Sequence, residues 1–180
     1  LTQIFKTSLA MDNTTRATVT KYEPNEYARV WREKLIEHKW DIETALLFGS
    51  QYTDGNGVTH TQGAIDYIIN YGNVFSGTGM GSGIGSKEAF GVAVKTFSTP
   101  YGDMNVARNV HLDGSPVKMV GVNMRYCSYR PLVGNGLNRD TAIYVGVQTL
   151  ENSGVDRRVD LIQTEAGMEF QMPEAHAVWK

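Results

Sequence analysis

The stretch PNEYARVWREKLIEHKWDIETALLFG, residues 24–49, carries the strongest secondary-structure signal in the chain. Asn25 after Pro24 suits an N-cap, Glu26 suits the positive end of a helix dipole, and Gly49 suits a C-cap. Apolar groups recur at spacings of three and four, at Ala28, Trp31, Leu35, Ile42 and Ala45 or Leu46, with His38 in the same stripe. The pattern predicts a helix of about 24 residues, roughly twice the average length.

Two tryptophans on this helix point in different directions. Trp31 and Trp40 are nine positions apart, which places them about 180° from one another on a helix that turns 100° per residue. They therefore do not share one core. One is expected to meet another segment or another subunit, and the alternative is a half-covered surface tryptophan.

The segments beside the helix read as shorter elements. TQIFKTSL and TRATVTKY are predicted to be two extended segments around an Asp12-Asn13 turn. The DGNG stretch, residues 54–57, predicts a hairpin turn rather than a calcium loop, because the later acidic ligands are absent. GAIDYIINYG predicts a second, short helix.

Beyond residue 88 the apolar period changes from 3.6 to 2, which predicts a strand-rich half. The alternating sets are Phe90, Val92 and Val94; Met104, Val106, Val110 and Leu112; Val120, Val122, Met124 and Tyr126; Ile143, Val145 and Val147; and Val155, Val159 and Leu161 against Asp156, Arg158 and Asp160. The chain closes with an extended pair around Pro173. A long helix followed by antiparallel strands, without repeated βα alternation, indicates an α+β protein rather than a doubly wound sheet.

Composition limits the possible partners. The 180-residue chain is 41% hydrophobic and 20% charged, with a net charge of -2, and it has no run of five or more like charges. This predicts a folded, soluble domain without the electrostatic footprint of a nucleic-acid or membrane binder. The single cysteine, Cys127, excludes a disulfide framework and favours a reducing compartment. The first residues contain no signal peptide and no initiator methionine, so we expect the chain to begin inside a longer parent.

The tract SGTGMGSGIGS, residues 76–86, has a glycine at every second position. A dinucleotide fingerprint needs glycines one and then three residues apart, and a P-loop needs Gly-Lys-Ser/Thr; neither occurs here. A strand is predicted after the tract, so the helix dipole that would hold a phosphate is missing. The tract is therefore interpreted as a flexible spacer.

No other motif indicates catalysis. The four histidines, His38, His60, His111 and His176, lack the ligand spacing of zinc enzymes and are expected at the surface or at an interface. Cys127 lies in a predicted strand and reads as a buried or interface thiol. We therefore predict no catalytic, cofactor-binding or metal-binding residues, and no enzyme activity.

Several stretches resemble the major capsid proteins of tailed bacteriophages. QIFKTSLAMDNTTRATVTKYEPNEYARVWREKLIEHKWDIETALLFG is similar to the part where an extended loop leads into the long spine helix. TPYGDMNVARNVHL, RYCSYRPLVGNGLNRDTAIYVGVQTLE and LIQTEAGMEFQMPEAHAVWK are similar to the returning C-terminal strands, in the same order along the chain.

The resemblance implies the HK97-like fold, in which the spine helix packs with an antiparallel sheet. It implies an extended-loop return strand at 1–22, the spine helix and the following short helix at 23–75, and β-rich return strands of the axial and peripheral domains at 87–180. The N-terminal arm, half of the extended loop and most of the axial domain are missing, so residues 76–86 are an engineered linker, a natural reduction or an untraced gap. We expect this chain to assemble poorly for that reason.

The implied function is that of a virion protein, made in the host cytoplasm, that self-assembles into an icosahedral shell. Copies would form hexamers and pentamers, with decoration or scaffolding proteins as possible partners, and would enclose DNA without sequence-specific binding and without a membrane. The alternatives are an encapsulin-type compartment shell, a small α+β binding module, and an enzyme whose site includes His60, His111 or His176. The expected packing or interface positions are Phe5, Trp31, Trp40, Arg130 and Trp179.

Overall fold

The structure is a computed structural model that describes residues 1–19, 25–76, 85–89, 92–100 and 102–180. The predicted long helix is confirmed as α2, Glu26–Phe48, which has 23 residues. The Asn25 side chain accepts a hydrogen bond from the Ala28 N–H at 3.0 Å, which is the expected N-cap. At the other end, the Gly49 N–H donates to the Ala45 carbonyl at 2.8 Å.

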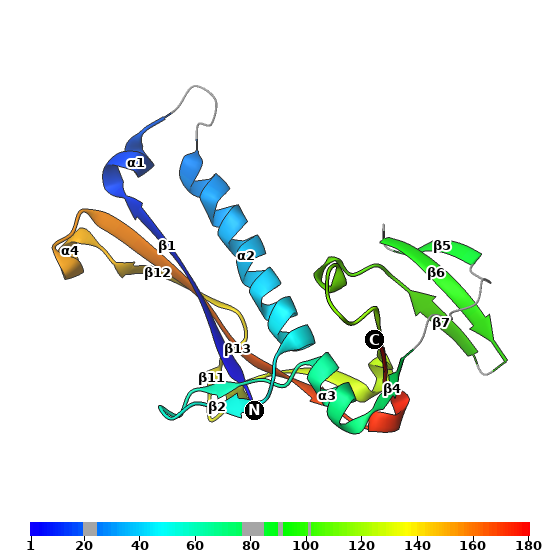
Figure 1. The fold of residues 1–180 in the computed structure, drawn as a ribbon. Coiled ribbons are helices and arrows are strands. Elements are labelled where there is room, and N and C mark those ends of the chain that lie inside the picture. Colours follow the sequence, from blue (N-terminus) through cyan, green and yellow to red (C-terminus); the bar gives the residue numbers. More distant parts are fainter. Residues whose placement is uncertain (20–24, 77–84, 90–91, 101) are drawn as a thin grey trace.

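The main sheet is built around one long central strand, β13, Arg157–Phe170. β1, Gln3–Asp12, pairs along one side of it in antiparallel register. β9, Cys127–Pro131, and β12, Ala142–Gln148, pair with successive parts of the other side. α2 lies across one face of this sheet (Figure 1). Between β9 and β12 the chain leaves the edge as a hairpin, β10 (Val133–Gly134) and β11 (Leu137–Asn138).

The sheet face under α2 forms the first part of the core. On β1, Phe5, Thr7 and Leu9 are buried, and they lie opposite Thr164, Ile162 and Asp160 of β13. The alternation predicted for β13 was therefore wrong in phase: it expected Asp160 outside and Val159 and Leu161 inside, whereas Asp160 is buried and the two apolar residues are half-buried. The reason is that Asp160 receives hydrogen bonds from several neighbours, which offset the cost of burying its charge.

The second part of the core lies under α3, Ala64–Tyr71, the predicted short helix. Here β14, Ala177–Trp179, pairs in parallel with β4, Asn73–Phe75, and antiparallel with β8, Met119–Gly121. Ile65, Ile68, Val117 and Val178 form its buried apolar cluster. The DGNG turn is confirmed, since residues 54–57 connect β2, Tyr52–Thr53, to β3, Thr59–His60.

A three-stranded antiparallel sheet stands apart from the rest of the molecule (Figure 1). It contains β5, Gly85–Ala89, β6, Val92–Thr99, and β7, Gly102–Val106. The predicted strands around Val94 and Met104 are thus confirmed, while Phe90 lies outside the described residues. Most of the glycine-rich tract also lies outside the described residues, which resume with a strand, as predicted.

Two predicted strand segments are 3-10 turns instead. The first, η1, spans Val110–Leu112, and the second, η2, spans Met124–Tyr126. In each case an asparagine precedes the turn, and its side-chain oxygen accepts from the backbone N–H two residues on, from Asn109 to His111 and from Asn123 to Arg125. This local bond turns the chain at the point where apolar alternation alone predicted extension.

The second extended segment predicted before α2 is also corrected. Residues Asn13–Ala17 form a short helix, α1, and the Thr18 hydroxyl donates to the Thr14 carbonyl at 2.8 Å. A second short helix, α4, Leu150–Ser153, follows β12. With antiparallel pairing in the main sheet and helices on its side, the mixed α/β structure is compatible with the predicted α+β class.

Candidate functional site

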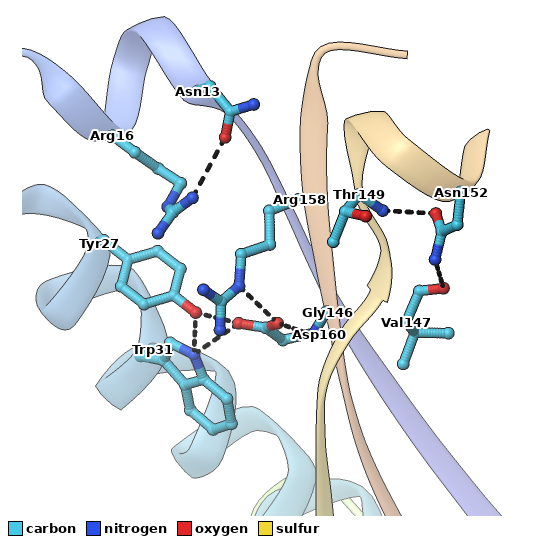
Figure 2. A network of polar contacts seen from close by, with 10 residues as sticks. All are labelled: Asn13, Arg16, Tyr27, Trp31, Gly146, Val147, Thr149, Asn152, Arg158 and Asp160. Atoms are coloured by element: carbon cyan, nitrogen blue, oxygen red, sulfur yellow. Dashed lines mark hydrogen bonds and ion pairs between the residues drawn. The ribbon is translucent and has the colours of Figure 1, made fainter. Parts of the chain in front are cut away.

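A buried carboxylate joins α2 to the sheet (Figure 2). Asp160 of β13 is 1% exposed. It accepts hydrogen bonds from the Tyr27 hydroxyl, from the Gly146 N–H at 2.6 Å and from Arg158 Nε at 2.9 Å. Trp31 Nε1 lies 3.4 Å from the same carboxylate and 2.9 Å from the Tyr27 hydroxyl. One side chain thus connects α2, β13 and the bulge that Gly146 makes in β12.

The electrostatics of this carboxylate suit an anchor. Burial raises the pKa of Asp160, but the hydrogen bonds from Tyr27, the Gly146 N–H and Arg158 outweigh burial, so that this pKa lies below its ordinary value. Burial, together with the bond to Asp160, raises the pKa of Tyr27. Asp160 is therefore ionised and Tyr27 neutral at neutral pH. The polar atoms of Asp160 and Tyr27 form hydrogen bonds within the subunit.

A second polar connection lies further along α2. His38 is 2% exposed, and its two ring nitrogens lie 2.9 Å from the Thr7 hydroxyl and 2.8 Å from the Thr164 hydroxyl. Thr141 continues this chain, with its hydroxyl 2.9 Å from that of Thr164. Burial lowers the pKa of His38, so the neutral imidazole bridges α2, β1 and β13.

The histidine prediction was wrong for two of the four. His38 is buried under α2, and His176 is 1% exposed, with Nδ1 accepting from the Asn123 N–H at 3.3 Å and Nε2 donating to the Gln171 carbonyl at 3.0 Å. His60 stacks on Tyr52. His111 Nε2 lies 3.4 Å from a carboxylate oxygen of Glu43. Buried histidines with partners on both nitrogens act in packing.

The described residues bring together no group of three or more His, Cys, Asp or Glu side chains that could hold a metal ion. Cys127 is half-buried at the start of β9, and burial raises the pKa of its thiol. A thiol with a raised pKa is a weak nucleophile at neutral pH. None of the helices in the described part of the chain is long and apolar enough to cross a membrane.

The five predicted packing or interface positions separate into two groups. Phe5 is buried between the sheet and α2, and Trp31 is half-buried beside Asp160. Trp179 stacks on Phe75 with ring centroids 5.3 Å apart. Trp40 is 56% exposed and meets His111 edge-on, and Arg130 is exposed and paired with Glu169. A role of any of them in subunit contact stays a prediction.

Many large apolar side chains are exposed on the surface. Among the described residues, 26 large hydrophobic side chains are exposed, against nine hydrophobic residues in the buried core. The densest run in the sequence follows β9, through the hairpin, β12, α4 and the turn before β13: Leu132, Val133, Leu137, Ile143, Tyr144, Val145, Val147, Leu150 and Val155. Alternation predicted β12 as a half-buried strand, but Ile143, Tyr144, Val145 and Val147 are all exposed, so neither face is fully covered within the chain. Exposed apolar patches of this kind mark interaction surfaces.

An apolar groove lies between the C-terminal half of α2 and the segment around η1 and η2. Its volume is about 480 Å³. The apolar lining comes from α2, α3, the residue after β8, η2 and β13, through Ile42, Leu46, Leu47, Ala64, Val122, Met124, Met168 and Phe170. Lys39, Glu43, Asn109 and Tyr129 complete it. The groove was not predicted from the sequence, because its lining residues come from segments that are far apart along the chain, between Lys39 and Phe170.

Comparison with known proteins gives one family. The family model described as SU10 major capsid protein matches residues 1–82 and 73–180. The two matches overlap at residues 73–82 and together span the chain. No curated protein matches the sequence.

Proposed function

The chain belongs to the SU10 major capsid protein family, and on that premise we propose that it is a shell subunit with an HK97-like architecture. A major capsid protein is a structural component of the virion, where copies of it assemble into the capsid. In the proposed architecture α2 is the spine helix and the β1–β13–β12 sheet is the layer on which it packs. Hexamers and pentamers are the proposed units of the shell.

The observation that carries this proposal is the exposed surface of the isolated chain. It exposes 12260 Å², whereas a compact monomer of 19.9 kDa exposes about 8,700 Å² by the usual scaling with mass. Subunit contacts in a shell would cover a large part of this excess. The family match favours a phage capsid over the encapsulin-type shell and the small binding module.

We also propose that residues 76–86 stand where a larger axial domain is reduced. The support is that the family match falls in two parts, and that they meet at residues 73–82, at the start of the glycine-rich tract. The proposed divisions are 1–22, 23–75, 76–86 and 87–180. The sequence of the complete gene product between positions 73 and 90 tests this proposal. If it contains about 80 or more additional residues there, about the size of a small domain, then the reduction is found in this 180-residue chain and not in the complete gene product.

The remaining partners are proposals of the same kind. Decoration or scaffolding proteins would bind the outer or inner surface, and the genome would be enclosed without sequence-specific contacts. The net charge of -2 supports this, because it offers no general attraction for DNA. Synthesis is proposed to take place in the host cytoplasm.

Electron microscopy and sedimentation of the complete gene product test the shell. The expected result is closed particles of megadalton mass. A stable monomer under conditions that vary salt, pH and protein concentration would overturn the proposed function.

A further inference from the structure

The β10–β11 hairpin presents apolar side chains to solvent. Its turn residues, Asn135 and Gly136, have φ of 49° and 79°, as in a type I′ turn. Residues 132–138 are all exposed and contain no charged side chain. The apolar residues Leu132, Val133 and Leu137 are 44%, 62% and 61% exposed. The hairpin therefore offers a narrow apolar projection at the sheet edge.

The groove beside α2 offers complementary chemistry. Its floor is apolar, and its charged residues are Lys39 and Glu43, both exposed on α2. Met124 lines the groove and is 76% exposed. None of residues 132–138 lines it, so the hairpin does not fill the groove of its own chain. An uncharged hairpin can enter this floor without burying an unpaired charge, and the Asn135 amide can pair with Lys39 or Glu43.

We propose that the β10–β11 hairpin of one subunit docks in the α2 groove of a second copy of the chain. This inference rests on the proposed shell-building function and names one pair of surfaces for it. A second copy is the occupant because both complementary surfaces are exposed on the same chain, and because the family assembles from copies of one protein. β12 is less suited to enter a groove, since it is paired to β13 and bulged near Gly146.

The two surfaces are different, so the contact is heterologous. Each subunit uses its hairpin toward one neighbour and its groove toward another, and such contacts close into rings or extend without limit. This property gives a sharp test. A variant with a disabled hairpin keeps its groove, and a variant with a disabled groove keeps its hairpin. The two variants are therefore expected to form one contact with each other, and the resulting dimer has no further pair of intact surfaces with which to grow.

The test uses Leu137→Asp in the hairpin and Met124→Asp in the groove. Sedimentation velocity over a range of concentrations is expected to show weak but measurable self-association of the unmodified chain into a series of oligomers. Each variant alone is expected to associate at least about tenfold more weakly, because a buried unpaired carboxylate costs more than the 1.4 kcal/mol that a factor of ten represents. An equimolar mixture is expected to form a one-to-one dimer and nothing larger.

The matched control is Val58→Asp, which places the same charge on the β2–β3 hairpin, where Val58 is 50% exposed. It is expected to associate like the unmodified chain. Circular dichroism verifies folding, and Leu137→Ser and Met124→Ser replace any aspartate variant that unfolds. The inference is overturned if either variant associates like the unmodified chain, or if the mixture forms no dimer. If the unmodified chain and the complete gene product both stay monomeric, the shell function itself fails.

Discussion

Asp160 shows how a single residue can orient an entire helix. Its carboxylate receives bonds from both Tyr27 and Trp31 of α2 and from the backbone of β12. Arg158 also lies 5.8 Å from the centre of the Tyr27 ring, which adds a cation–π contact. The angle between helix and sheet is thus fixed by directional bonds rather than by apolar packing alone.

Asp160→Asn is expected to lower the free energy of unfolding by about 3 kcal/mol, because it breaks a buried charged network and leaves donors without a full acceptor. The pKa of Asp160 is depressed in the folded state, so its contribution is present above the unfolded pKa and is lost as pH falls through the folded pKa. Urea denaturation between pH 2 and 7 is expected to show a smaller acid-induced loss for the variant. Asp113→Asn, at an exposed ion pair, should change stability by about 1 kcal/mol or less.

His38 makes the free energy of unfolding depend on pH in a second range, which lies above that of Asp160. Burial depresses its pKa below 6.5, so its stabilising effect is complete above that value and is lost as pH falls through the folded pKa. His38→Asn is expected to flatten the stability curve in this range. Thr7→Val, which removes one hydroxyl partner and keeps the imidazole, should cost about 1 kcal/mol and retain the slope. An unchanged slope in His38→Asn would show that another group is responsible.

At the scale of elements, the crossing between α2 and α3 depends on two glycines that pack backbone to backbone. The Gly63 N–H donates to the Gly49 carbonyl at 2.7 Å. A Cβ on Gly63 would lie 2.5 Å from the Gly49 nitrogen and 2.8 Å from the Leu47 carbonyl oxygen, and one on Gly49 would lie 2.4 Å from the Ala45 carbonyl oxygen. These glycines are required for close approach rather than for a left-handed conformation.

Gly63→Ala is accordingly expected to destabilise the fold by about 1–3 kcal/mol, since rigid backbone atoms must move to make room for the methyl group. Gly55→Ala is the control, because a Cβ there meets nothing within 4 Å. Thermal unfolding of the two variants should separate them clearly. Equal melting temperatures would contradict the close packing of the crossing.

The elements also show which features are readable from sequence. α2 was predictable because its cap and its apolar stripe are local signals. The buried phase of β13 was not, because it depends on partners of Asp160 that come from α2 and β12, more than 100 and about 14 residues away along the chain. η1 and η2 were missed because Asn109 and Asn123 turn the chain against its apolar alternation. The hairpin and the groove could not be predicted as a pair of surfaces, since only the folded structure shows that both are exposed to solvent.

On the scale of the whole molecule, the chain is open rather than spherical. The β5–β7 sheet stands away from the main sheet, and α2 is covered mainly on the side that faces β1 and β13 (Figure 1). Only His38 of α2 is buried. A helix of this length with one buried residue depends on few internal contacts for its position, and we expect neighbouring subunits to cover part of the rest.

The pairing of β1 with β13 has a consequence for timing during synthesis. Phe5 lies opposite Thr164 in the sheet, so the ribosome adds the partner of β1 about 160 residues after β1 itself. At about 5–20 residues per second, this delay is roughly 8–30 s. Until β13 is synthesised, the main sheet beneath α2 lacks its central strand. The β10–β11 hairpin is then not yet held at the edge of this sheet. We therefore expect subunits to become competent for assembly only after β13 has been synthesised, which keeps growing chains that still lack β13 from joining prematurely.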